Sequence, residues 1–313
     1  MRRIIFIVMI VLIALPLQVQ AKYPSRAITI IVPSAAGGST DATARIFIKA
    51  AKNYWPEADF VVKNVSGSGG QKGFEEIARA KADGYTIGMV FTTQVVAHIV
   101  SKRAKYTLDS FHVMGNVGQD PEIVVVPKNS SITSLDELVK AAKEKTLTAT
   151  VNGIGSDDFV AMRKFEEIAG VTFNMMPTKG STEQKAAILG GHVDVSFMNL
   201  SQMHGQHKAG DARIIAILDE TRSDLVMDVK TGIEQGYKVL MTAARGFVAP
   251  AKIDKDVADK LDDLLQKVLK DPGFIADCKK DSLFLLPMTG TQFLGYLKEL
   301  QIDTQRYYNK NPW

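Results

Sequence analysis

The sequence of 313 residues is poor in cysteine, with Cys278 as its only example. A protein with one cysteine has no internal disulfide, so its hydrophobic core has to stabilise the fold unaided. Apolar residues make up 46% of the chain, which is ample for that purpose. Because Cys278 falls in the helical pattern DPGFIADCKK, we expect a buried, small apolar side chain and no reactive thiol.

Long apolar runs are missing after the first 21 residues. Arg2 and Arg3, the apolar run IIFIVMIVLIALPL and the small residues around Ala21 are typical of a secretory signal peptide. The apolar run has about 14 residues, fewer than the roughly 20 that a membrane-spanning helix needs, which disfavours the alternative of an uncleaved anchor. We therefore expect residues 1–21 to be a signal peptide, cleaved after Ala21, and the mature protein to be periplasmic.

The chain also has little excess charge of either sign. Its formal net charge is +4, and the two arginines of the leader account for half of that, leaving about +2 on the mature protein. So small an excess, evenly spread, disfavours nucleic acid or an anionic membrane surface as a partner. Nothing in the pattern indicates an obligate interface, so we expect a monomer.

Motifs of nucleotide-binding and hydrolytic enzymes are absent from the sequence. There is no GxxxxGK[ST] loop, and Lys72 stands where the dinucleotide fingerprint needs its third glycine. GxSxG and HExxH are missing as well. His204 and His207 are three apart, but no nearby carboxylate completes a metal site, so we expect neither a metal nor a cofactor. These absences argue against an enzyme and leave a secreted hydrolase as the weaker alternative.

What the sequence does contain is a regular alternation of short apolar runs and amphipathic segments, among them FHVMGNVG and EIVVVPK as two short strands. Nearly continuous apolar strands between helices are typical of a parallel sheet buried on both faces. The pattern occurs twice, which predicts an α/β fold of two lobes, residues 22–120 with 241–313 and residues 121–240. The chain would cross between lobes in extended segments near 118–127 and 241–250, and ligands usually bind in such a cleft.

Four loops of small residues follow strands of this pattern, two in each lobe. The first runs from Pro33 to Ser39, and the others are residues 67–70, 152–156 and 178–181. Unshielded N–H groups at a helix N-terminus are a good anion site, and we expect Ser39 or Thr40 to cap the first of these helices. A tight turn that merely needs small residues is the alternative, but four such loops favour backbone donors that share one ligand.

Several segments resemble the Bug-type extracytoplasmic solute receptors of tripartite tricarboxylate transporters. They follow one another along nearly the whole mature chain: YPSRAITIIVPSAAGGSTDATAR, NVSGSGGQKG, KADGYTIGM, LGGHVDVSFMN, KAGDARIIAI, TRSDL and RGFVAP. The resemblance implies a type II periplasmic-binding-protein fold, whose two α/β lobes close on a small organic acid. It also implies delivery of that acid to the membrane permease subunits of a tripartite transporter. A ligand-sensing receptor for a signalling partner is the alternative.

The resemblance further implies that the loop at residues 34–39 holds one carboxylate, largely through backbone amides and ordered water. We expect the second lobe to close on the distal end of the ligand. The expected ligand-binding residues are Ser34, Ala35, Ala36, Gly37, Gly38, Ser39, Thr92, Thr93, Gly155, Ser156, Asp157, Thr178 and Gly180.

The second-lobe loop departs from the family pattern GxGSSSH, because Asp157 and Asp158 replace two serines and Phe159 replaces the histidine. An acid at position 157 would repel a second carboxylate, so a tricarboxylate is disfavoured. A monocarboxylate, or a ligand with an amine or a neutral distal end, fits better. The alternative is that both acids simply begin the next helix, where they favour its positive end, and face solvent.

Overall fold

The computed structural model describes residues 23–310 and 312–313. The predicted signal peptide lies outside the described residues. Within them, none of the helices has the length and apolar character that crossing a membrane requires. We call the part built on the first three strands the first lobe, and the part built on strands β5 to β8 the second lobe.

Strands and helices alternate in the first lobe, as the sequence predicts. β1 pairs in parallel with both β2 and β3, so their carboxyl ends and the loops that follow them share one edge of the sheet. The elements in chain order are β1 (Ile28–Val32), α1 (Ser39–Ala51), β2 (Phe60–Asn64), α2 (Gln71–Arg79), β3 (Thr86–Phe91), α3 (Gln94–Val100) and the 3-10 helix η1 (Leu108–Ser110).

The second lobe repeats this arrangement. β5 pairs in parallel with both β6 and β7, which again gathers the following loops at one edge. Its elements are α4 (Leu135–Glu144), β5 (Thr148–Val151), α5 (Asp157–Ala169), β6 (Asn174–Pro177), α6 (Ser181–Leu189), β7 (Val195–Asn199), α7 (Leu200–Ala209), β8 (Ala212–Ile217) and the 3-10 helix η2 (Ile233–Gln235).

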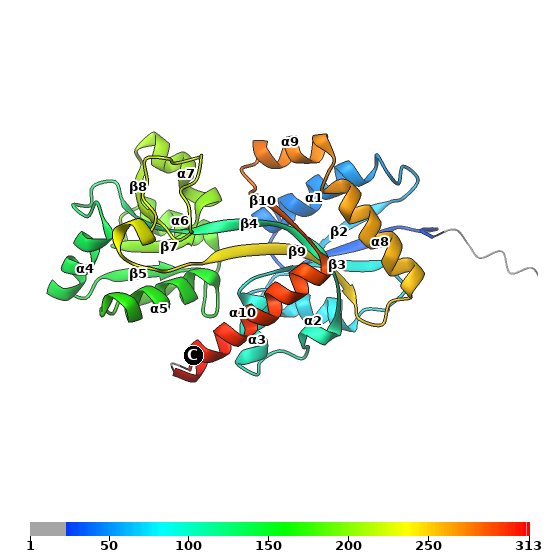
Figure 1. The fold of residues 1–313 in the computed structure, drawn as a ribbon, viewed down its shortest axis with the longest axis horizontal. Helices are drawn as coiled ribbons and strands as arrows, with labels where there is room; N and C mark the ends of the chain where they lie inside the picture. The colour runs from blue at the N-terminus through cyan, green and yellow to red at the C-terminus, as the bar shows by residue number, and fades with distance from the viewer. Residues whose placement is uncertain (1–22, 311) are drawn as a thin grey trace, which may run out of the picture.

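Two long strands, β4 (Phe111–Pro127) and β9 (Thr242–Pro250), cross between the lobes side by side (Figure 1). They pair in antiparallel fashion from Phe111 opposite Pro250 to Pro121 opposite Thr242. The two extended crossings are therefore confirmed. The boundaries drawn at 120/121 and 240/241 stay a prediction.

The prediction of two short strands, FHVMGNVG and EIVVVPK, in this crossing is wrong, because β4 is continuous over 17 residues. Pro121 breaks a strand only where its missing N–H would be needed. On one side of β4, pairing with the C-terminal strand has ended at Gly118, and pairing with β7 begins at Glu122. Pro121 lies in the gap between these two partners, where no strand on that side requires its N–H.

The chain ends in the first lobe with α8 (Lys255–Val268), α9 (Pro272–Lys280), β10 (Leu285–Thr289) and α10 (Gly290–Lys310). The last helix extends back towards the second lobe (Figure 1), where Lys310 Nζ lies 2.7 Å from Glu167 Oε1 on α5. Trp313 packs edge-on against Phe159 of α5, with 5.2 Å between the ring centroids. The C-terminal segment thus links the two lobes.

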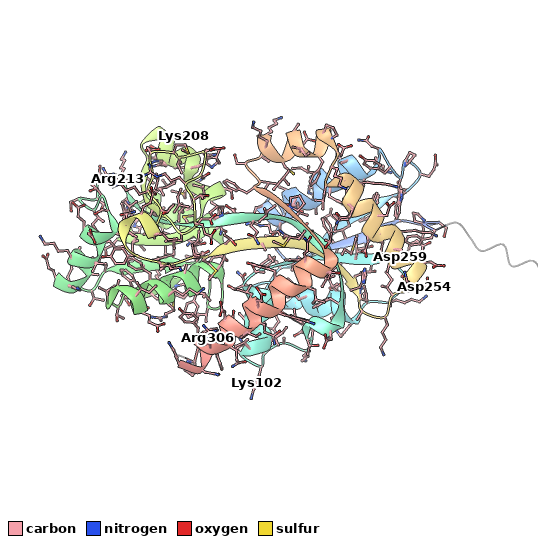
Figure 2. All side chains as sticks on the ribbon, viewed as in Figure 1. Lys102, Lys208, Arg213, Asp254, Asp259 and Arg306 are labelled. Atoms are coloured by element: carbon pink, nitrogen blue, oxygen red, sulfur yellow. The ribbon has the colours of Figure 1, made fainter. Side chains whose placement is uncertain are left out.

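The described strands form one mixed sheet in the order β2-β1-β3-β9-β4-β7-β5-β6, with β8 and β10 also paired to β4. In the first lobe, α1, α8 and α9 enclose one core around Phe47, and α2, α3 and α10 enclose another around Phe74. The second lobe has its own cores on the two faces of its sheet, around Phe165 and Met198. Charged side chains project from both lobes, as Lys102 and Lys208 illustrate in Figure 2.

Candidate functional site

The loop at residues 34–39 presents an uncapped helix N-terminus. Gly38 is the N-cap of α1, and no side chain caps the helix, so the expectation that Ser39 or Thr40 would do so is wrong. Ala35, Ala36 and Gly37 are exposed. The first N–H groups of a helix have no partner within it, so those of α1 remain available to an external acceptor.

Asp41 holds this loop in place from the first turn of α1. Its buried carboxylate accepts hydrogen bonds from Gly37 N at 3.0 Å, Arg45 Nε at 2.9 Å and Asn64 Nδ2 at 3.0 Å. Burial acts to raise the pKa of Asp41, but the hydrogen bonds from Arg45, Gly37 and Asn64 outweigh it and leave the pKa below its usual value. Asn64 also donates to Ser34 O at 3.2 Å. Asp41 is therefore an ionised group that positions the loop, and the amide of Gly37 is already occupied.

Thr92 and Thr93, joined by a cis peptide bond, lie between β3 and α3 and are fully buried. The Thr92 hydroxyl accepts a hydrogen bond from Ala244 N at 2.9 Å, on the crossing strand β9. In the described part of the chain, Thr93 Oγ1 and the neighbouring Gln94 Oε1 are buried without a hydrogen-bond partner. Thr92 thus has a structural partner, whereas Thr93 and Gln94 hold unused polar atoms.

Two of the predicted second-lobe side chains are already engaged within their own lobe. Ser156 is the N-cap of α5, where its Oγ accepts from Phe159 N at 3.0 Å and donates to Gly153 O at 2.9 Å. Thr178 Oγ1 lies 3.2 Å from both Val151 O and Gly180 O. Their hydroxyls therefore support the loops, and what this part of the lobe offers to a ligand is backbone.

The two glycines predicted in the second lobe behave differently from these side chains. Gly180 is the N-cap of α6 and, like Gly38, leaves that helix without a side-chain cap. Gly155 has φ of +84°, and a Cβ atom there would lie 3.1 Å from Ala97 Cβ on α3 of the first lobe. A residue without a side chain is needed at Gly155 because the backbone turns left-handed and the lobes approach closely.

The alternative that Asp157 and Asp158 face solvent is wrong, since they are only 3% and 2% exposed. Asp157 Oδ2 accepts from Asn199 Nδ2 at 2.7 Å, and Asp158 Oδ2 accepts from Asn152 N at 2.8 Å. The same Asn199 amide donates to Glu122 Oε2, on β4, at 3.1 Å. Glu122 of β4 lies opposite Asn199 at the end of β7, and Asn199 contacts the first residue of α5. The first residues of α5 therefore point into the protein and away from water.

This arrangement gathers three buried carboxylates, which we call the acid cluster: Glu122, Asp157 and Asp158. One ligand oxygen from each lies within 4.8 Å of the others. Burial is the largest cause that raises the pKa of all three, and mutual repulsion raises the pKa of Glu122 and Asp158 further. The acid cluster therefore favours either protons or another positive charge.

A buried ion pair lies next to the acid cluster. Both Nη atoms of Arg245 on β9 are 3.4 Å from Asp120 Oδ2 on β4. Ser201 N also donates to Asp120 Oδ1 at 3.1 Å. Burial raises the pKa of Asp120, against the opposing effect of Arg245.

Sequence reasoning missed Glu122, Asn199, Asp120 and Arg245. A signal was present, because Glu122 opens the apolar strand EIVVVP and Arg245 interrupts the apolar strand TAARGFVAP. Charged residues in such runs are almost never buried unless they are paired. The sequence did not show which residues would pair.

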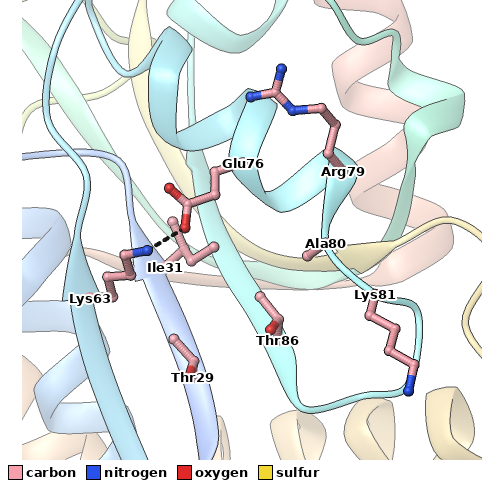
Figure 3. Close-up of a pocket in the computed structure, with 8 residues that line it drawn as sticks. All are labelled: Thr29, Ile31, Lys63, Glu76, Arg79, Ala80, Lys81 and Thr86. Atoms are coloured by element: carbon pink, nitrogen blue, oxygen red, sulfur yellow. Dashed lines mark hydrogen bonds and ion pairs between the residues drawn. The ribbon is translucent and has the colours of Figure 1, made fainter.

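Two surface cavities are lined by other described residues, and the second adjoins the predicted site, because the Thr92 hydroxyl lies 3.4 Å from the carbonyl oxygen of Thr242 in its lining. One, of about 400 Å³, is at the edge of the first lobe, where Lys63 Nζ lies 2.7 Å from Glu76 Oε1 and Arg79 and Lys81 lie across the cavity from this pair (Figure 3). The other, of about 220 Å³, lies where α5, β9 and α10 meet and includes Lys164, Thr242 and Tyr296. Neither cavity contains a predicted ligand-binding residue.

Comparison with known proteins gives a consistent family. The family model described as "Tripartite tricarboxylate transporter family receptor" matches residues 55–298. Protein BugT of Bordetella pertussis is 30% identical over 220 residues, which cover 69% of this chain and 67% of BugT.

Solved structures agree with this family in fold. The periplasmic binding protein BugD is 26% identical, with a TM-score of 0.83 over 92% of this chain and 98% of BugD. MatC from Rhodopseudomonas palustris with bound malate is 21% identical, with a TM-score of 0.83 over 91% of this chain and 99% of MatC. The prediction of a two-lobed periplasmic-binding-protein fold is confirmed.

Proposed function

The chain belongs to the tripartite tricarboxylate transporter receptor family, and on this basis we propose that it captures a small organic carboxylate between its lobes and delivers it to the permease subunits of such a transporter. The family is one of solute-binding receptors and not of enzymes, which removes the hydrolase alternative. The single observation that carries the proposal is the uncapped N-terminus of α1, behind a loop of exposed small residues.

We place the main carboxylate at residues 34–39. α1 has 13 residues, so its dipole directs a partial positive charge at the loop. Asp41 occupies only the Gly37 amide, which leaves the neighbouring donors for the ligand. Thr93, whose hydroxyl is buried and unpaired in the described structure, would add a side-chain contact.

We propose that the second lobe closes on the distal end of the ligand mainly through its backbone. Ser156 and Thr178 have committed their hydroxyls to their own loops, whereas the uncapped N-terminus of α6 at Gly180 supports a second set of amide donors. A ligand that contacts both lobes stabilises the closed form because it binds that form better. The proposed contacts are Ser34, Ala35, Ala36, Gly38, Ser39, Thr92, Thr93, Gly155, Ser156, Thr178 and Gly180. Gly37 and Asp157 are left out of this set, because the Gly37 amide bonds Asp41 and the buried Asp157 carboxylate bonds Asn199.

The two units that move would be residues 22–120 with 241–313 and residues 121–240, hinged on β4 and β9. Family members are periplasmic binding proteins, and we propose the same compartment for this chain, reached through a cleaved leader at residues 1–21. We further propose that the mature receptor is a monomer, because nothing in the sequence pattern indicates an obligate interface.

A thermal-shift screen against small mono- and dicarboxylic acids tests the proposed function. A ligand that binds only the native state raises the melting temperature by mass action, by an amount that grows with its concentration. We expect at least one acid to do so, and calorimetric titration then gives its stoichiometry and affinity. If no carboxylic acid shifts the melting temperature while neutral solutes do, the carboxylate assignment is wrong.

A further inference from the structure

We propose that the acid cluster formed by Glu122, Asp157 and Asp158 is a binding site for a hard divalent cation, with Ca²⁺ as the best fit. The site is separate from the loop at residues 34–39, and its occupation does not require an organic ligand. Four observations carry the inference: charge, donor type, burial, and unpaired oxygen atoms.

The charge balance within the described residues leaves the acid cluster without a counter-ion. Its three carboxylates are between 0% and 3% exposed. The positive charge of Arg245 acts to lower the pKa of Asp157, but this guanidinium is already paired with Asp120. Buried carboxylates that lack a cation are costly, and they normally pair with a positive group or coordinate a metal.

The donor atoms define the class of cation. All three side chains offer carboxylate oxygens, and the acid cluster contains no histidine or cysteine. Oxygen-only ligand sets suit Ca²⁺, Mg²⁺ and Mn²⁺, whereas zinc and copper sites use nitrogen and sulfur donors.

The burial favours the larger ion. The ligand oxygens lie within 4.8 Å of one another on side chains that are almost fully buried. Mg²⁺ gives up its water shell reluctantly and needs near-ideal octahedral geometry, whereas Ca²⁺ accepts flexible sets of protein oxygens.

Two unpaired buried oxygen atoms supply evidence independent of the charges. Glu122 is fully buried, and its Oε1 has no hydrogen-bond partner in the described structure. Gln184 on α6 is not a member of the acid cluster, but its amide interacts with the Asp158 carboxyl. Gln184 Nε2 donates to Ser196 Oγ at 3.1 Å and to Phe197 O, while Gln184 Oε1 is buried and unpaired.

A buried oxygen without a donor is rare in native proteins and calls for a partner. Glu122 Oε1 belongs to the acid cluster itself, and the unpaired Gln184 Oε1 is carried by a side chain that interacts with the Asp158 carboxyl. A carbonyl oxygen next to three carboxylates is the kind of mixed set that Ca²⁺ accepts, because this ion takes six to eight oxygen ligands in flexible geometry. One bound Ca²⁺ would therefore both pair these oxygen atoms and balance the negative charge of the acid cluster.

The test uses the mature protein after treatment with a chelator, and no organic acid is added. Calorimetric titration with CaCl₂ should show one site per chain, and a thermal melt should shift upwards with Ca²⁺. MgCl₂ should bind at least about tenfold more weakly. The absence of both heat and a melting shift at millimolar Ca²⁺ would overturn the proposal, whatever the variants do.

Variants locate the site. Asp158→Asn and Glu122→Gln keep the shape of each side chain but remove a charge, so each should weaken Ca²⁺ binding by at least about tenfold. The matched control is Glu166→Gln, at the other end of α5, because Glu166 is also a buried carboxylate but bonds Phe173 N and Arg163. Its affinity for Ca²⁺ should equal that of the wild type.

Unchanged Ca²⁺ affinity in both cluster variants, or an equal loss in Glu166→Gln, would show that the cation binds elsewhere and would overturn the assignment. Should one cluster variant fail to fold, the other reports on the same site. A protein that binds Ca²⁺ but no organic acid would contradict the proposed function and leave this inference intact, so the two failures are distinguishable.

Discussion

Arg245 and Asp120 form an ion pair across the two strands that join the lobes. Both guanidinium Nη atoms of Arg245 lie 3.4 Å from Asp120 Oδ2, and the two residues are 8% and 1% exposed. The pair spans the register in which Gly118 is opposite Arg245 and Asp120 is opposite Ala243. It therefore fixes the crossing strands to each other at the point where the chain passes between lobes.

Breaking this pair from one side should be costly. Arg245→Met leaves the Asp120 carboxylate buried without its guanidinium, and we expect the free energy of unfolding to fall by about 3 kcal/mol. The double variant Arg245→Met with Asp120→Asn removes both charges and should recover most of that loss. Urea unfolding measures the free energy of unfolding of both variants. Equal values for the single and the double variant would show that the unpaired Asp120 carboxylate does not cause the loss of stability.

Gly38→Val should weaken carboxylate binding by at least about tenfold without loss of the fold, because a branched side chain beside the α1 amides obstructs the acceptor. The fold tolerates the change, since a Cβ at Gly38 meets only Ala35 O at 3.6 Å and the backbone φ of −80° is ordinary. Gly205→Val on α7 is the matched control, because a Cβ there also has open space. Calorimetric titration with an acid found in the screen compares them, and wild-type affinity in Gly38→Val would refute the placement of the site.

The acid cluster should make the chelator-treated protein less stable as pH rises. Burial, together with Asp158, Asp157 and Asp120, raises the pKa of Glu122 well above its usual value. The folded state therefore holds a proton that the unfolded state releases near pH 4, so the free energy of unfolding falls as pH rises above about 4 towards the folded pKa.

Glu122→Gln removes this titrating group, and the variant should lose stability less steeply over the same range. Thermal melts at a series of pH values compare the slopes. Parallel curves for wild type and variant would mean that Glu122 keeps its charge in the folded protein. Asp157, Asp158 and Asp120 remain in the variant beside Arg245, so a residual slope is expected.

Cys278 should not react with thiol reagents in the native protein. Its side chain is fully buried, and burial, with smaller effects from Asp277 and Asp281, raises the pKa of the thiol to about 12. The thiolate is the reactive form, so labelling at neutral pH requires unfolding. Labelling by a chromogenic disulfide reagent with and without denaturant checks this, and rapid modification of the folded protein would contradict it.

The fold could be predicted to the extent that it depends on local pattern. Apolar strands between amphipathic helices, repeated twice, indicated the two α/β lobes, and the extended segments near 118–127 and 241–250 indicated the crossings. The prediction of two short strands in the first crossing was wrong, because the effect of Pro121 on a strand depends on which neighbouring strand needs its N–H. That neighbour is distant in sequence, so no local rule reports it.

The candidate site could likewise be predicted only in part. Small residues after β1 indicated an open backbone at residues 34–39, and the structure has the helix uncapped at Gly38. Ser156 and Thr178 were read as ligand donors, but their hydroxyls bond Phe159 N and Val151 O. A hydroxyl forms a hydrogen bond with the nearest unsatisfied backbone group, and the sequence does not show where that group lies.

The sequence by itself therefore determined the alternation of elements, the positions of the small-residue loops and the family, because these depend on periodicity and on residues close together in the chain. Only the tertiary structure decided that Glu122 of β4, Asp157 and Asp158 of α5 and Gln184 of α6 meet in one buried place. The burial of a charge depends on which surfaces cover it, and those surfaces come from segments far apart in sequence that only folding brings into contact.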